Sequence, residues 1–160
     1  LCFMGSEFAQ QREWNHDSQL DWELLNNSKH QGIQKLTADL NQIYQEHRAL
    51  HQLDCSPSGF EWRLMEENEQ SILAHERLDG NGERILVVSN FTPIPRADLR
   101  IGMPNAGQYE LLLNTDDSIY GGSHYSVPAK LTTENISSHD QAQSLLCQIP
   151  PLATVFYRLV

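Results

Sequence analysis

Hydrophobic and polar residues follow two different periods along this chain, one before and one after residue 55. Between Gln31 and Leu50, apolar positions recur every three or four residues, as on one side of an amphipathic helix. The residues on this stripe are Ile33, Leu36, Leu40, Ile43, Tyr44 and His47. The spacing therefore predicts a helix over about residues 31–50.

Beyond the segment 54–59, which combines proline, glycine and two serines, short runs of alternating residues replace the helical period. Strands are expected at residues 61–65, 71–78, 83–90, 98–101, 108–114, 130–136, 144–149 and 153–160. The tetrapeptide Asp79-Gly80-Asn81-Gly82 between two of these runs is typical of a hairpin turn. Many short strands without intervening helices predict an antiparallel β-sandwich.

The first four residues, Leu1-Cys2-Phe3-Met4, form an apolar run that ends at Gly5. This run predicts a short buried strand, and it is too short to cross a membrane. Because a buried strand needs neighbours on both sides, we expect its partners to precede residue 1. The chain is therefore expected to be a piece of a larger protein.

The charge balance narrows the classes of partner. The 160 residues carry a net charge of -10 and contain no basic cluster, which argues against nucleic acid and against an anionic membrane surface. A neutral, hydroxyl-rich ligand such as a sugar is compatible with this charge. The three cysteines, Cys2, Cys55 and Cys147, form no CxxC pair, so we expect reduced thiols and a cytoplasmic location.

Six stretches of the chain together carry a family resemblance. They are FMGSEFAQQREWN at 3–15, LDW at 20–22, GFEW at 59–62, SNFTPIPR at 89–96, LNTD at 113–116 and PPLATVFYRL at 150–159. In this order they resemble the carboxy-terminal part of bacterial 1,4-α-glucan (glycogen) branching enzymes, members of the α-amylase superfamily. The resemblance runs from residue 1 to residue 160.

The resemblance implies a division of the chain into two parts. Residues 1–55 would be the remnant of a (β/α)8 catalytic barrel, namely its last strand, the following loop and its last helix at about 31–50. Residues 59–160 would be the carboxy-terminal all-β domain. The fold class expected is thus mainly β, an antiparallel sandwich preceded by a barrel remnant.

The resemblance also implies a function for the parent protein, a glycosyltransferase of glycogen biosynthesis that forms α-1,6 branches on α-1,4-glucan. Retaining chemistry of this kind needs two carboxyl groups about 5–5.5 Å apart. In the family these groups come from earlier barrel strands, so none of the catalytic residues is expected in this chain, which should be inactive by itself and need no cofactor.

The fragment's own role is expected to be support of the barrel and contact with glucan. Two alternatives stay open: an independent carbohydrate-binding module, and a purely structural domain with no ligand. Without its barrel partners, we expect disorder at the amino terminus, docking of the helix on the β-domain, or self-association.

Glu7 and Trp14 are the candidates for lining the substrate cleft. Glu7 either helps to shape the cleft or only holds the loop after the first strand by hydrogen bonds. Trp14 is flanked by polar residues and is the better candidate for stacking on a glucose ring, whereas packing is favoured for Trp22.

In the β-domain, Tyr120 and Tyr125 flank a Gly-Gly turn and are expected to be an exposed pair that contacts glucan. Trp62 and Tyr109 could join them in a surface platform for carbohydrate, but both lie within predicted strands, so core packing is favoured for these two. His47 and His51 are four residues apart and would share a helix face, but no third ligand is evident and no metal site is expected.

Overall fold

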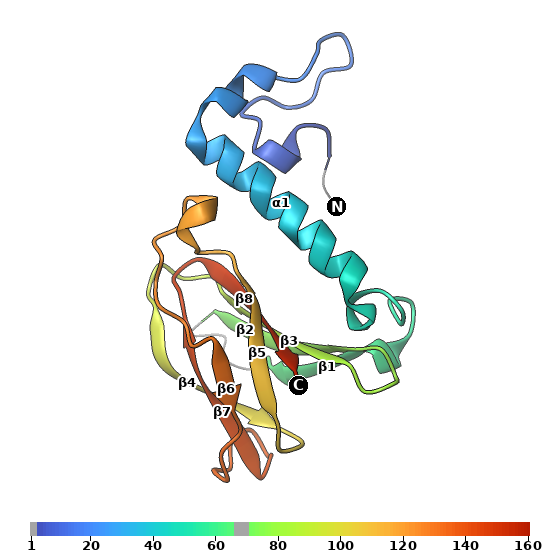
Figure 1. Cartoon of the computed structure of the whole chain (residues 1–160), viewed down its shortest axis with the longest axis vertical. Helices are drawn as coiled ribbons and strands as arrows, with labels where there is room; N and C mark the ends of the chain where they lie inside the picture. Colours follow the sequence, from blue (N-terminus) through green and yellow to red (C-terminus); the bar gives the residue numbers. More distant parts are fainter. Residues whose placement is uncertain (1–2, 66–70) are drawn as a thin grey trace.

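The computed structural model describes residues 3–65 and 71–160. The described residues form eight strands, which build a sandwich of two antiparallel sheets (Figure 1). The strands are β1 (Phe60–Leu64), β2 (Ile72–Leu78), β3 (Arg84–Asn90), β4 (Arg96–Met103), β5 (Gln108–Asn114), β6 (Lys130–Thr132), β7 (Gln143–Ile149) and β8 (Ala153–Leu159). The larger sheet has the order β1-β2-β3-β8-β5-β6, and β4 pairs with β7 in the smaller one. The predicted antiparallel sandwich is confirmed.

The predicted hairpin connects β2 and β3. Gly80 and Gly82 both have positive φ, at 78° and 113°, which glycine adopts without steric cost. The Oδ1 atom of Asp79 accepts hydrogen bonds from the backbone N–H groups of Asn81 and Glu83, at 2.7 and 3.0 Å. The carboxylate thereby satisfies two backbone donors of the turn and stabilises its shape.

The core lies between the two sheets and consists of alternate residues of the strands. It includes Leu64, Ile72, Ala74, Leu86, Val88, Ile101, Met103, Leu145, Cys147, Ile149, Val155 and Tyr157. Within it, Glu76 is fully buried, and its carboxylate accepts hydrogen bonds from Arg63, Arg84 and Tyr109 at 2.7, 3.1 and 3.0 Å. The buried charge is thus paired, as a charge in a protein core has to be.

Helix α1 (Ser28–Glu46) precedes the sandwich. It begins after Asn27, whose side chain accepts a hydrogen bond from the backbone N–H of Lys29 at 2.9 Å, a normal N-cap contact. The helix starts three residues earlier and stops four residues earlier than the apolar spacing predicts. Figure 1 shows it running from the amino-terminal segment down to the sandwich. No described helix is long and apolar enough to cross a membrane.

Two contacts hold α1 against the sandwich. Near its start, Gly32 is buried against the backbone of Tyr120 in the loop between β5 and β6. Beyond its end, Ala49 and Leu50 pack on Ile85 and Val87 of β3. The helix therefore docks on the β-domain, which is one of the three outcomes expected for a chain without its barrel partners.

The expected buried strand at residues 1–4 is wrong for Phe3 and Met4, and its other two residues lie outside the described part. Phe3 and Met4 belong to no strand and are more than half exposed. The carbonyl of Phe3 instead accepts a hydrogen bond from Ser6 N–H at 2.8 Å, and the chain turns into the 3-10 helix Ser6–Phe8. None of the described strands lies beside Phe3 and Met4, so a strand would leave their backbone groups unpaired.

Candidate functional site

Three rings form a cluster on the edge of the larger sheet. Phe60 and Trp62 of β1 and His75 of β2 are in mutual contact, with ring centroids 4.8–5.9 Å apart. Phe60 stacks on His75, and Trp62 meets both rings edge-on. Trp62 is 47% exposed although it lies within a strand. We call these three residues the ring cluster.

A β-bulge places the ring cluster on the outside of the sandwich. The pairing of β1 with β2 shifts register between Trp62 and Leu64, so these residues point to opposite faces although two positions separate them. Leu64 enters the core, whereas Trp62 joins the outer face of the sheet. The expectation that Trp62 belongs to the core is therefore wrong.

Polar groups border the ring cluster. Arg77, the cross-strand partner of Phe60, donates a hydrogen bond from Nε to the carbonyl of Gly59 at 3.2 Å and is ion-paired with Asp54. The phenol of Tyr44 donates to the same carboxylate at 3.0 Å. These hydrogen bonds, first that of Arg77, hold the pKa of Asp54 below its usual range. Asp54 therefore stays charged beside the rings.

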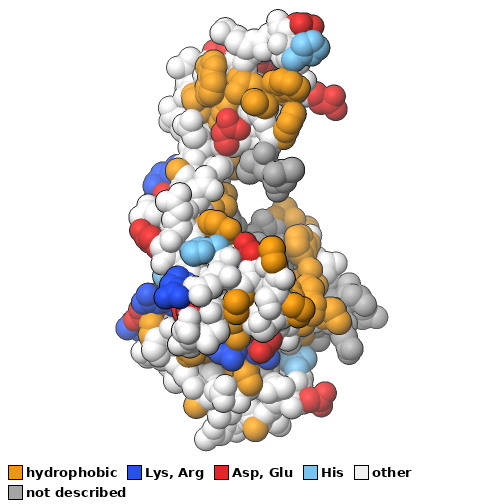
Figure 2. Space-filling model, turned by 90° about the vertical axis from the view of Figure 1, so that its right-hand side faces the viewer, with side chains coloured by type: hydrophobic (Ala, Val, Ile, Leu, Met, Phe, Trp, Pro, Cys, Tyr) orange, Lys and Arg blue, Asp and Glu red, His pale blue; other side chains and the backbone are white. Residues whose placement is uncertain are grey.

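Arg77 and Asp54 also line a groove of about 470 Å³ between α1 and the outer face of the larger sheet. Its apolar part consists of Leu40, Ile43, Tyr44, Leu50 and Phe156. Figure 2 shows hydrophobic side chains gathered on the amino-terminal segment and along one edge of the sandwich. The ring cluster and the groove are thus two parts of one outer face, with Arg77 between them.

The imidazole of His75 is partly withdrawn from water under the other two rings. Burial lowers its pKa from the usual value, and the positive charge of Arg77 acts in the same direction. At neutral pH the ring cluster is therefore uncharged, which suits contact with a neutral ligand.

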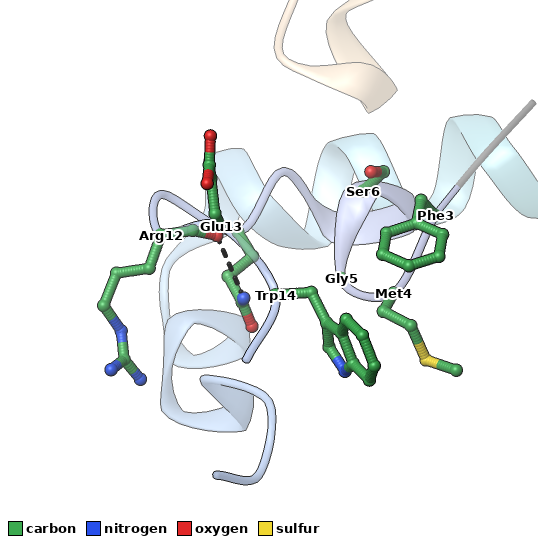
Figure 3. A pocket seen from close by; sticks show the side chains of 8 residues that line it. Phe3, Met4, Gly5, Ser6, Arg12, Glu13 and Trp14 are labelled. Atoms are coloured by element: carbon green, nitrogen blue, oxygen red, sulfur yellow. Dashed lines mark hydrogen bonds between the residues drawn. The ribbon is translucent and has the colours of Figure 1, made fainter. Parts of the chain in front are cut away.

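A second hollow, of about 320 Å³, lies in the amino-terminal segment. In Figure 3 the rings of Phe3 and Trp14 point to the same side, with the side chain of Met4 next to them. The two rings meet edge-on with centroids 5.3 Å apart, and Trp14 is 41% exposed. Trp14 lines this hollow together with Arg12 and Glu13, and its place in a substrate cleft stays a prediction.

Glu7 lies near this hollow but is engaged by its own loop. Its Oε2 atom accepts a hydrogen bond from the backbone N–H of Gly5 at 2.9 Å, and its carbonyl accepts one from the Thr37 hydroxyl of α1 at 3.2 Å. The first contact supports a Glu7 carboxylate that holds the loop, and the second, made by the backbone carbonyl, joins the same loop to α1. Trp22 was expected to pack within the protein rather than to stack on a glucose ring. Its ring contacts that of Phe8, with centroids 5.2 Å apart, while the side chain remains half exposed.

The two tyrosines that were expected to form an exposed pair, Tyr120 and Tyr125, differ in exposure and in hydrogen-bond partners. Tyr120 is only 8% exposed, and its phenol donates a 2.6 Å hydrogen bond to Oδ2 of Asp39 on α1. Burial and this bond raise the pKa of Tyr120 well above its usual value. Tyr125 is half-buried, and its backbone N–H donates to the buried carboxylate of Asp116 at 2.9 Å. The expected exposure is therefore wrong for Tyr120, because its loop folds back onto α1.

The histidines at 47 and 51 do not share a helix face, because α1 ends at Glu46. His47 pairs through Nδ1 with Glu83 at 2.7 Å, and the ring of His51 lies 5.5 Å from that of Tyr44. Among the described residues, no three histidine, cysteine or acidic side chains are grouped as metal ligands.

The sequence reasoning missed Phe60, His75 and Arg77 as site residues. The signal that was available is the spacing of Phe60 and Trp62, which places two rings on one face of a strand. It becomes meaningful only with the pairing of β1 and β2, which brings His75 and Arg77 beside them.

Comparisons with known proteins agree with this architecture. The family model described as alpha amylase, C-terminal all-beta domain, matches residues 62–160. The 1,4-alpha-glucan branching enzyme GlgB of Aliivibrio fischeri is 60% identical over 99% of this chain, which covers 22% of that protein. The protein of the same name from Vibrio parahaemolyticus is 57% identical, with 99% of this chain and 21% of the relative covered. The chain spans about a fifth of the length of these relatives.

Among solved structures, an alpha-amylase from H. orenii is similar with a TM-score of 0.46 and 16% identity, over 95% of this chain and 22% of that one.

Proposed function

Because this chain belongs to the family of alpha amylase C-terminal all-beta domains, we propose that it is the carboxy-terminal part of a 1,4-α-glucan branching enzyme. The observation that carries the proposal is the extent of the identity, 60% over 99% of the chain. It includes α1 and the amino-terminal segment as well as the sandwich. A β-sandwich alone serves many functions, whereas a match through both parts points to one protein class.

In this proposal the longer protein cleaves an α-1,4-glucan and transfers the chain to a sugar 6-hydroxyl, forming an α-1,6 branch. The reaction needs a nucleophile and an acid/base, two carboxyl groups about 5–5.5 Å apart in a formed cleft. We assign both to the part of the protein that precedes this chain. The segment 1–160 contributes support and substrate contact rather than bond cleavage.

The test is to incubate linear amylose with the longer protein and, separately, with this chain, and to count α-1,6 linkages by proton NMR. We expect new branch signals with the longer protein only. Branching or hydrolysis by the chain alone would contradict the assignment of the catalytic groups. The absence of branching by the active, folded longer protein would contradict the proposed function itself.

The glucan contact of this chain is assigned to the ring cluster. Flat aromatic faces pack against the apolar faces of glucose rings, and neighbouring polar groups fix the orientation of such ligands. Phe60, Trp62 and His75 supply the rings, and Arg77 and Asp54 supply the polar border. The ring cluster replaces the pair Tyr120 and Tyr125, since the phenol of Tyr120 is already bound to Asp39.

The hollow around Trp14 is assigned to the edge of the catalytic cleft of the longer protein, with Glu7 holding its loop. This follows the division into a barrel remnant at 1–55 and an all-β domain at 59–160. In support, the segment before residue 55 packs on itself through Phe8, Trp22 and α1.

The groove between α1 and the larger sheet is assigned to contact with the preceding barrel. Apolar residues on its walls are only partly covered, among them Ile43 and Tyr44. In the chain by itself, this surface favours self-association, which light scattering would detect as a mass above that of the monomer. A cytoplasmic location fits the fully buried, unpaired Cys147.

A further inference from the structure

Asn81 is the one asparagine of the sequence that is followed by glycine. The pair forms the tip of the hairpin between β2 and β3, outside both strands. It plays no part in the ring cluster or in the assignments above, and its chemistry is separate from them.

The surroundings of Asn81 and Gly82 are open. Both residues are exposed, and a Cβ atom placed on Gly82 would meet no atom within 4 Å. Among the residues that the structure describes, none is recorded accepting a hydrogen bond from the Gly82 N–H. Since glycine has no side chain and great backbone freedom, this nitrogen reaches the Asn81 side chain after a small local rearrangement.

We propose that Asn81–Gly82 is a site of spontaneous deamidation. The backbone nitrogen of Gly82, on losing its proton to water or hydroxide, attacks Cγ of Asn81. The bond from Cγ to Nδ2 breaks, ammonia leaves, and a five-membered succinimide forms. One water molecule then opens the succinimide at either carbonyl, which yields aspartate or isoaspartate at position 81.

The modification disturbs a turn that depends on an amide at this position. The carboxylate of Asp79 accepts a hydrogen bond from the backbone N–H of Asn81 at 2.7 Å, and the neighbouring Asn81 side chain helps to lower the pKa of Asp79. After deamidation, a second carboxylate replaces the neutral amide near Asp79, and the two negative charges repel each other.

The effect extends to the junction with α1, because Glu83 follows Gly82 directly. Glu83 accepts hydrogen bonds from His47 at 2.7 Å and from the backbone N–H of Ala49 at 2.9 Å. An isoaspartyl link adds a carbon to the main chain two residues before Glu83 and shifts this carboxylate. The hydrogen bonds between Glu83 of the hairpin and the end of α1 are then weakened.

The test is to age the purified chain at mildly alkaline pH and to map its peptides by mass spectrometry. A synthetic peptide of residues 76–86 in the same buffer gives the rate for an unfolded chain. We expect the Asn81 peptide of the folded chain to gain about 1 Da and to split into two products. Its rate should be within roughly ten-fold of the free peptide, because an exposed hairpin tip opens at little cost.

Internal controls come from Asn105 and Asn135, which are exposed and followed by Ala106 and Ile136. They should change more slowly than Asn81. The proposal is overturned if Asn81 stays intact while the free peptide converts, or if Asn105 or Asn135 reacts first.

The variant Asn81→Ser removes the amide and keeps a polar turn residue. The mass gain in this peptide must disappear in the variant, and its persistence would refute the assignment. In the wild type, the amide NMR signal of Ala49 should move as the modified fraction grows. An unmoved signal at full conversion would overturn the coupling to α1.

Discussion

A Cβ atom placed on Gly32 would lie 2.5 Å from the backbone oxygen of Tyr120. Helix and loop therefore meet backbone to backbone at this point, and only a residue without a side chain fits. Asp39 lies seven residues after Gly32 on the same helix, and its carboxylate accepts a hydrogen bond from the phenol of the same tyrosine. These two contacts with one loop residue hold the first half of α1 on the sandwich, and the packing of Ala49 and Leu50 on β3 holds the segment beyond its end.

Gly32→Ala should lower the free energy of unfolding. Helix propensity alone predicts a gain of about 1 kcal/mol, but the clash with Tyr120 costs about 1–3 kcal/mol and displaces the loop. We expect a net loss of about 1 kcal/mol in urea unfolding. Gln34→Ala, at an exposed position of the same helix, is the control. If Gly32→Ala stabilised the chain as much as Gln34→Ala, the contact of Gly32 with Tyr120 would not be a tight one.

Tyr120→Phe should cost about 1 kcal/mol at neutral pH, since it removes one hydrogen bond to a carboxylate. That bond is the largest cause of the lowered pKa of Asp39, so this pKa should rise toward its ordinary value. A carboxyl with a lowered pKa stabilises the fold above its unfolded pKa and loses this contribution as pH falls through the folded pKa. The difference between variant and wild type should therefore shrink below about pH 4. A difference that is constant with pH would contradict the role given to the hydrogen bond.

Glu76→Gln tests the buried charge of the core. The carboxylate pairs with Arg63 and Arg84, and both are mostly buried. Removing one partner of a buried ion pair costs about 3–5 kcal/mol, and we expect a loss of that order by urea unfolding. Glu110→Gln removes a charge from the surface pair with Lys130 and should change stability by about 0–1 kcal/mol. Similar losses in the two variants would contradict a special role of the buried site.

The pH dependence of stability should contain a contribution from His75. Burial lowers its folded pKa, so the unfolded chain binds a proton at higher pH than the folded chain does. The contribution of neutral His75 to the free energy of unfolding is fully present above the pKa of the unfolded chain, about 6.5. It is lost as the pH falls from that value through the lower pKa of the folded chain. His75→Phe keeps a ring in the cluster and should lose less stability between about pH 7.5 and 5.5. Parallel stability curves for variant and wild type would contradict this.

The strands of the sandwich were predictable because their residues alternate between a core and an exposed face. The predicted range 108–114 coincides with β5, and the other ranges fall on the seven remaining strands with differences at their ends. The hairpin at residues 79–82 was predictable for a similar local reason, since its glycines take positive φ.

The site was less predictable, because it depends on contacts between distant residues. The bulge between Trp62 and Leu64 breaks the alternation that places Trp62 in the core. Tyr120 is buried against α1 and donates a hydrogen bond to Asp39, a residue 81 positions earlier in the chain. Neither the bulge nor the packing of Tyr120 on α1 leaves a periodic pattern in the sequence.

The most direct test of the glucan contact is a two-dimensional NMR titration of this chain with maltoheptaose, observing amides and the tryptophan indole N–H groups. We predict shifts at the Trp62 indole and at the amides of β1 and β2, and their loss in Trp62→Ala, a substitution at a half-exposed site that should leave the fold intact. A well-dispersed spectrum that does not move would contradict the account and leave a purely structural domain. Shifts confined to Tyr125 or Trp14 would place the contact elsewhere and would equally contradict the ring cluster as the glucan site.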